Sequence, residues 1–230
     1  MTLKNQSSDN LYQNYKKNTQ RAYDYEKTIS YHRAQTEKLS WIRFTTWRQR
    51  KIVELFLKRI ENNSEIKVLD VPCGTGIMTD VITKYTTNLL SIDISDDMLN
   101  IAKENYPQGK YVNLDILQLN SLNQSFDLVL TIGILHRLPQ DIRNKVLYNI
   151  SQITKKYIIV TFTKDYYLMR IKRIIMGIIF NNYKPAPQPI KYSTFTKEIC
   201  NQGLTIIKKI AVFPFLSSEI VVLLSKKTNK

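Results

Sequence analysis

Residues 67–82 decide the fold, and they read KVLDVPCGTGIMTDVI. A short apolar run ends in Asp70, a turn with two glycines follows, and an amphipathic stretch begins after Gly76. This order predicts a buried strand, a tight turn and the start of a helix. Glycine lets the backbone approach a ligand closely, and the free N–H groups of a helix start point into the same space. We expect a nucleotide-like ligand at this turn; the alternative is a turn that only joins strand and helix.

The spacing of the glycines indicates which ligand the turn holds. A dinucleotide fingerprint requires a third glycine three residues after the second, and Thr79 occupies that position. The run 69–76 instead resembles the first motif of the class I S-adenosylmethionine-dependent methyltransferases, D/E-x-G-x-G-x-G. Pro72 replaces the first glycine of that motif, which removes one backbone donor. The resemblance places four residues against the cofactor: Asp70, Cys73, Gly74 and Gly76.

A second motif follows at the distance that the family shows. The apolar run 89–92 ends in Asp93, which comes 23 residues after Asp70. An acidic residue at the end of the second strand can accept hydrogen bonds from both ribose hydroxyls. The residues after it also resemble the family, which implies that Ile94 and Met98 flank the adenine.

Two further strand ends complete the expected cofactor site. The resemblance implies that Asp115 bonds the adenine amino group and that Ile116 offers its backbone N–H to the ring. The segment 126–139 resembles the family's fourth strand and the loop after it, which implies that Thr131 and Ile132 lie beside the cofactor. The segment lacks the Asn/Asp-Pro-Pro-aromatic tetrad that methyltransferases of base or glutamine amino groups use. That absence counts against those acceptors.

Three residues are weaker candidates for roles at the site. His136 follows the fourth strand and is the one residue of the expected core whose unperturbed pKa suits a general base, although a packing role is its alternative. His32 is a candidate for acceptor contacts. Arg43 resembles the arginine that many small-molecule methyltransferases pair with the methionine carboxylate. The two histidines and two cysteines show no metal-ligand spacing, so we expect no metal.

The alternation of apolar runs and amphipathic segments predicts an α/β fold. By resemblance this is a Rossmann-like seven-stranded, mostly parallel sheet with helices on both faces and a terminal antiparallel hairpin. We expect an N-terminal helical cap over 1–64 and a methyltransferase domain over 65–230, with 164–191 a basic apolar insertion or lid. The expected helices are 21–60 in two or three pieces, 77–85, 95–106, 141–151 and 194–201, and the hairpin strands are 204–213 and 219–225. Within the cap we expect Trp41, Phe44 and Trp47 to be packing anchors rather than a base-stacking platform.

Charge and composition bound the partners. The net charge is +15, and the excess lies outside residues 67–163, which carry equal numbers of basic and acidic residues. Such an excess favours an anionic partner, with a solvated basic surface as the alternative. The apolar run 166–180 is shorter than the roughly 20 residues that cross a bilayer, and it suits a core helix, a lid or a helix lying on a membrane. With no apolar signal segment and two separate cysteines, we expect a cytoplasmic protein, with peripheral contact to a membrane as a further option.

The sequence thus predicts a methyltransferase that uses S-adenosylmethionine and acts on a small, apolar or anionic acceptor, such as a lipid-linked or quinone-like compound. One alternative is an RNA methyltransferase that uses the basic flanks, which requires a contiguous basic face around the cofactor mouth. A second alternative is a non-enzymatic basic module that binds a membrane or partner through 166–180.

Overall fold

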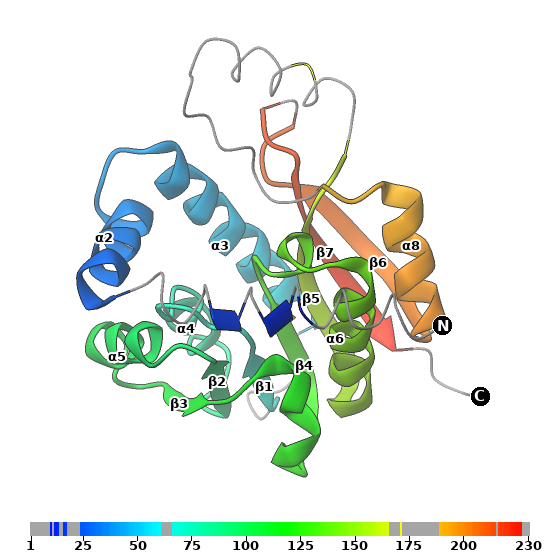
Figure 1. Ribbon diagram of the computed structural model, residues 1–230, viewed down its shortest axis with the longest axis horizontal. Helices are drawn as coiled ribbons and strands as arrows, with labels where there is room; N and C mark the ends of the chain where they lie inside the picture. Colours follow the sequence, from blue (N-terminus) through cyan, green and yellow to red (C-terminus); the bar gives the residue numbers. More distant parts are fainter. Residues whose placement is uncertain are drawn as a thin grey trace.

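The sheet has seven strands, five of them parallel. The computed structural model describes residues 10, 12–13, 16–17, 24–60, 66–165, 171, 189–214 and 216–226. The strand order is β3-β2-β1-β4-β5-β7-β6, and β7 runs antiparallel to both of its neighbours (Figure 1). The strands are β1 (Val68–Asp70), β2 (Leu89–Asp93), β3 (Lys110–Asn113), β4 (Phe126–Thr131), β5 (Thr154–Thr163), β6 (Leu204–Ala211) and β7 (Glu219–Lys226). The predicted fold class and terminal hairpin are therefore confirmed.

Helices connect and cover these strands. They are α2 (Tyr25–Thr36), α3 (Trp41–Ile60), α4 (Thr79–Ile82), α5 (Asp96–Asn105), α6 (Gln140–Ile153) and α8 (Tyr192–Asn201), with 3₁₀ segments η1 (Ile116–Leu122) and η2 (Leu135–Arg137). The helix expected over 77–85 is shorter than predicted, because the turn after β1 continues to Met78. The helix α5 begins where Ser95 Oγ accepts from the N–H of Met98, so the chain caps it immediately after β2.

Alternate residues of the central strands pack on opposite faces of the sheet. Leu69 and Val129 belong to one apolar cluster, together with residues of η1, α6 and α8. Val68 and Leu128 belong to a second cluster, together with residues of α3 and α4. A parallel sheet buried on both faces reads as continuous apolar runs, which is why the strands could be located from sequence.

The N-terminal helices differ from expectation in one respect. The C-terminal half of α3 buries Ile52 and Phe56 in the second cluster, as its apolar pattern predicts. Trp41, Phe44 and Trp47 are instead about half exposed, so the expectation that they are packing anchors is wrong. They lie in the first two turns of α3, before the residues of the helix that belong to the second cluster.

One expected segment cannot be compared with the structure. The apolar run 166–180, and most of the proposed insertion 164–191, fall outside the described residues. Among the helices that are described, none is both long and apolar enough to cross a membrane.

Candidate functional site

A cavity of about 390 Å³ lies at the carboxyl ends of the parallel strands. This is where ligands bind in open parallel sheets, next to the point at which the strand order reverses between β1 and β4. The volume lies within the range of about 300–1,000 Å³ that is typical of small-molecule sites. The structure brings together here nine of the residues predicted from sequence: Asp70, Cys73, Gly74, Asp93, Ile94, Met98, Asp115, Ile116 and Ile132, with His136 at the same cavity.

The two glycines of the turn serve different purposes. Both adopt positive φ, 54° at Gly74 and 77° at Gly76. A Cβ at Gly74 would meet no atom within 4 Å, and Gly74 lines the cavity, so the open space above its backbone can admit a ligand. A Cβ at Gly76 would lie 2.9 Å from the ring of Tyr106, so Gly76 permits close packing against the end of α5. Gly76 does not line the cavity itself.

The carboxylate of Asp93 joins two loops. Its Oδ2 accepts from the N–H of Gly74 at 2.8 Å, and its Oδ1 accepts from the N–H of Ser95 at 3.0 Å. A carboxylate offers about four acceptor sites, and Asp93 lines the cavity, so it can also accept from a hydroxyl group of a ligand. Burial raises the pKa of Asp93, while these backbone donors oppose the shift.

Asp70 is completely buried beside Asp93. Within the described part of the chain, neither of its oxygens has a hydrogen-bond partner. Burial, together with the nearby charge of Asp93, raises the pKa of Asp70 to about 8. A buried carboxyl group without a partner at a cavity wall fits a ligand that brings a hydrogen-bond donor or a positive charge.

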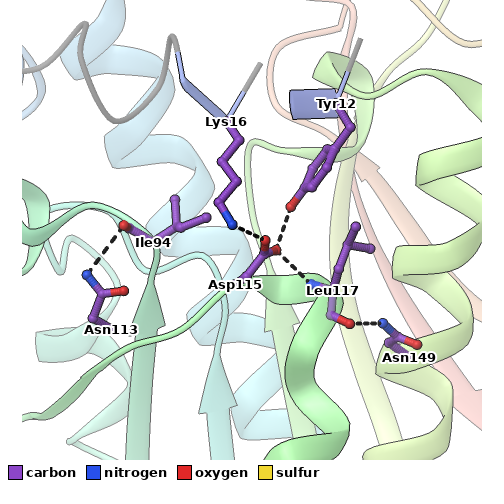
Figure 2. Close-up of polar contacts among 7 residues, drawn as sticks. All are labelled: Tyr12, Lys16, Ile94, Asn113, Asp115, Leu117 and Asn149. Atoms are coloured by element: carbon purple, nitrogen blue, oxygen red, sulfur yellow. Dashed lines mark hydrogen bonds and ion pairs between the residues drawn. The ribbon is translucent and has the colours of Figure 1, made fainter. Parts of the chain in front are cut away.

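The side chain of Asp115 is held by the N-terminal residues (Figure 2). Tyr12 Oη donates to its Oδ1 at 2.5 Å, and Lys16 Nζ pairs with its Oδ2 at 3.0 Å. The same Oδ1 accepts from the N–H of Leu117, which caps η1. Both Tyr12 and Lys16 line the cavity, and sequence reasoning missed them because the contact spans about a hundred residues of chain. A tyrosine and a lysine in a polar N-terminal segment carry no signal of that contact.

The walls between these acids are apolar. Ile94, Met98, Ile116 and Ile132 all line the cavity. Thr131 is fully buried and lies outside the lining, and its Oγ1 has no partner among the described residues. Apolar walls bounded by acids suit a heteroaromatic ring that carries amino donors.

The opposite end of the cavity is assembled from distant parts of the chain. Gln49 of α3, His136 and Arg137 of η2, Thr163 of β5 and Glu219 of β7 all line it. Burial raises the pKa of Glu219 to about 7, against the opposing effects of a hydrogen bond from Gln49 and the charge of Arg137.

His136 is also buried at this end. Burial, and then the neighbouring charge of Arg137, lower the pKa of His136 to about 4, so its ring is neutral at pH 7. Its Nδ1 has no hydrogen-bond partner within the described residues. Glu219 was not found from sequence, because a single glutamate at the start of a terminal strand carries no motif.

Two residues proposed from sequence lie away from the cavity. His32 is buried with its Nδ1 3.0 Å from Thr75 Oγ1 and its ring against Tyr106, so α2 rests on the glycine turn through this residue. Arg43 is exposed on α3 and its Nη1 donates to the carbonyl of Glu37 at 3.0 Å. Neither His32 nor Arg43 is among the lining residues.

Comparisons with known proteins agree with this architecture. The sequence model of a family described as a methyltransferase domain matches residues 68–157. The chain is 28% identical over 193 residues to the ubiquinone/menaquinone biosynthesis C-methyltransferase of Campylobacter jejuni (strain 81-176), which covers 70% of this chain and 79% of that protein. It is 30% identical over 91 residues to the ubiquinone biosynthesis O-methyltransferase of Coxiella burnetii, which covers 36% of this chain and 38% of that protein.

A solved structure shares the fold at low sequence identity. The magnesium protoporphyrin IX methyltransferase of Synechocystis PCC 6803, crystallised with S-adenosylmethionine, superposes with a TM-score of 0.74 at 14% identity. The superposition covers 92% of this chain and 97% of that protein. The likeness therefore extends over the sheet and the helices on both of its faces.

Proposed function

This chain belongs to the class I S-adenosylmethionine-dependent methyltransferases, and we propose that it methylates a small, apolar, quinone-like acceptor. The observation that carries the proposal is one cavity with acidic residues at one end and, beside η2 and β7, a second end with one acid, Glu219, and one base, Arg137. The relatives named for quinone biosynthesis support this acceptor class.

We propose that the acidic end holds the cofactor. Asp93 accepts the ribose hydroxyls through its remaining acceptor sites, and Asp115 faces the adenine amino group. Ile94 and Met98 flank the ring. The open space above Gly74 admits the remainder of the ligand at close approach to the backbone. The other proposed cofactor contacts are Asp70, Cys73, Ile116 and Ile132. Three residues expected from sequence to bind the cofactor do not line the cavity. We propose that Gly76 shapes the turn, that Thr131 packs behind the cavity wall, and that Arg43 does not contact the cofactor.

The fit to this cofactor rests on charge. Asp70 and Asp93 lie side by side, and Asp70 lacks any partner among the described residues. A cationic ligand relieves both the repulsion between them and the cost of burying an unpaired carboxyl group. When bound, S-adenosylmethionine supplies a methyl group on a positively charged sulfur.

The second end of the cavity would manage the acceptor's proton. A quinol that gains a methyl group at a ring carbon or a hydroxyl oxygen loses one proton. Glu219 is the best-placed group to accept it, because a general base is most effective when its pKa lies near the working pH. His136 stays neutral there with an unpartnered Nδ1, which supports a role in orienting the acceptor rather than in taking the proton.

The test is methyl transfer to a defined acceptor. Purified protein would be incubated with S-adenosylmethionine and a short-chain prenylated naphthoquinol under reducing conditions, and the products analysed by mass spectrometry. We expect a product heavier than the acceptor by one methylene unit. Transfer to an RNA transcript with none to quinols or related phenols would overturn the proposal and favour the RNA alternative.

Contact with a membrane through 166–180, and a lid formed by that segment, stay predictions because the segment falls outside the described residues.

A further inference from the structure

The first two turns of α3 expose an unusual set of aromatic side chains. Trp41, Phe44 and Trp47 are exposed by 51%, 47% and 53%. Their three-residue spacing puts neighbouring members on the same side of the helix. Single exposed apolar residues are ordinary, whereas a contiguous apolar surface marks a site of interaction.

This surface extends beyond the helix. Leu39, just before α3, is 84% exposed, and Leu216, in the connection between β6 and β7, is 60% exposed. The Trp41 ring packs on Phe213 of the same connection, with 5.3 Å between the ring centroids. We call these six residues the aromatic surface: Leu39, Trp41, Phe44, Trp47, Phe213 and Leu216.

Basic residues are interleaved with the aromatic ones. Between residues 38 and 53 the chain has five Lys or Arg and no Asp or Glu. Lys38 and Lys51 are exposed, and Arg48 is partly exposed. Tryptophan prefers the boundary between headgroups and acyl chains, and each basic residue near an anionic bilayer adds about 1 kcal/mol of attraction. This combination fits an anionic lipid surface, and the chain's net charge of +15 favours the same partner.

The aromatic surface also adjoins the cavity. Ile42, Thr45 and Gln49 of the same helix line the cavity, and Ile42 is itself 45% exposed. The first half of α3 therefore separates the active-site cavity from the aromatic surface. An acceptor dissolved in a bilayer would reach the cavity without crossing bulk water if this surface rested on the membrane.

We propose that the aromatic surface docks on bilayers that contain anionic phospholipids. Trp41, Phe44 and Trp47 enter the interfacial layer, and Lys38 and Arg48 bind the headgroups. The proposal assigns membrane contact to described residues of α3 and the β6–β7 connection rather than to 166–180. It does not depend on the identity of the acceptor.

The tryptophans themselves provide the readout. The chain has two, Trp41 and Trp47, and both belong to the aromatic surface. We expect vesicles of phosphatidylcholine with about one-third phosphatidylglycerol to shift the tryptophan emission to shorter wavelength and to sediment the protein. Brominated acyl chains should quench the emission. An emission spectrum that such vesicles leave unchanged would overturn the proposal.

Matched variants locate the surface. Phe44→Ser keeps both tryptophans and should weaken vesicle binding about tenfold, since it removes the burial of one aromatic ring. Lys38→Glu combined with Arg48→Glu should weaken binding to anionic vesicles and change binding to pure phosphatidylcholine little. The control is Tyr148→Ser, because Tyr148 is 52% exposed on α6, which covers the opposite face of the sheet.

Two outcomes of these binding experiments would contradict the proposal. Equal vesicle binding by Phe44→Ser and the unmodified protein would reject α3 as the docking surface. Tryptophan quenching by a single-stranded RNA, without any response to vesicles, would assign the surface to nucleic acid instead. Calorimetric binding of S-adenosylhomocysteine and far-ultraviolet circular dichroism check that each variant is folded, and neither readout requires the acceptor.

Discussion

The two ends of the cavity are built in different ways. The proposed cofactor end is built mainly from residues between Asp70 and Ile116, at the ends of β1, β2 and β3 or directly after them. Ile132 after β4 and two N-terminal residues, Tyr12 and Lys16, complete it. The acceptor end joins Gln49 of α3 to η2 and to Glu219 of β7. Local motifs therefore specify the first end, and the packing of distant elements specifies the second.

The electrostatics of the two ends differ as well. Asp70 and Asp93 share the cofactor end, where Asp70 has its pKa raised to about 8. Glu219, with a pKa near 7, and the neutral His136 share the acceptor end with Arg137. One end is arranged to attract a cation, and the other holds a single acid that changes its protonation near neutral pH.

The largest effect should follow from removing the acid at the acceptor end. Glu219→Gln should lower the turnover number about 100-fold, because general-base catalysis typically contributes about 10²–10⁴. The affinity for S-adenosylhomocysteine should change less than about twofold, since binding of the cofactor depends on the other end. Steady-state kinetics with the naphthoquinol and calorimetry measure the two quantities. Full turnover in Glu219→Gln would remove Glu219 from the mechanism.

The pH profile separates Glu219 from His136. The unmodified enzyme should gain activity as the pH rises through about 7, where Glu219 ionises, and Glu219→Gln should lose this rise. His136→Gln should retain it, because His136 is already neutral above about pH 4. A rise near pH 7 that disappears in His136→Gln and persists in Glu219→Gln would reverse the assignment.

The next largest effect concerns the cofactor end. Asp93→Ala should weaken binding of S-adenosylhomocysteine more than tenfold, because it removes a charged acceptor and the link between the N–H groups of Gly74 and Ser95. Calorimetric titration gives the dissociation constant. The control is Asp96→Ala, since Asp96 is exposed, accepts a hydrogen bond from Asn113 and does not line the cavity. An unchanged constant in Asp93→Ala would reject the placement of the ribose.

This difference also determines what could be predicted from sequence. The strands were predictable because central parallel strands are apolar runs that end at acids and glycines. The family, the enzyme class and the cofactor followed from the resemblance of the segments around Asp70, Gly74 and Asp93 to the class I methyltransferases, and the comparisons bear these predictions out. Membership in a family of enzymes speaks against the alternative of a non-enzymatic basic module. Proximity of the motif residues in sequence is enough to bring them together once the strands are parallel neighbours.

The remaining features depend on tertiary contacts. Tyr12 and Lys16 reach Asp115 from the far end of the chain, and Glu219 enters the cavity only because β7 pairs with β5. Trp41 and Phe44 were expected to pack in the interior because aromatic residues usually do. The first two turns of their helix, however, contribute no residue to the second apolar cluster, which α3 joins only from Ile52 onward. No periodicity in the sequence distinguishes an aromatic surface for docking from one for packing.

A smaller effect tests how the N-terminal residues act on the cofactor end. Tyr12→Phe removes one donor to Asp115 and leaves the carboxylate more available to a ligand. We expect S-adenosylhomocysteine to bind about threefold more tightly, which corresponds to one net hydrogen bond. Calorimetry at one ionic strength measures the change. Weaker binding would show that the Tyr12 hydroxyl stabilises the closed cavity more than it competes with the ligand.

The smallest effect is on stability, and it concerns the unpartnered carboxyl group of Asp70. Because its pKa is raised from 3.8 to about 8, the folded protein binds more protons than the unfolded chain between these pH values. Protonated Asp70 therefore contributes stability to the folded protein, and this contribution is lost progressively as the pH rises from 3.8 to about 8. Asp70→Asn cannot ionise, so its unfolding midpoint relative to the unmodified protein should rise by about 5 °C between about pH 5 and about pH 9.

Thermal unfolding of the ligand-free proteins by circular dichroism measures this difference. A constant difference across the pH range would show that Asp70 is ionised at neutral pH despite its burial. Saturating S-adenosylhomocysteine sharpens the comparison, because a ligand ammonium group beside Asp70 would stabilise its charged form and lower its pKa. The advantage of Asp70→Asn at high pH should then disappear, whereas a ligand that lies only against Asp93 and Asp115 would leave it in place.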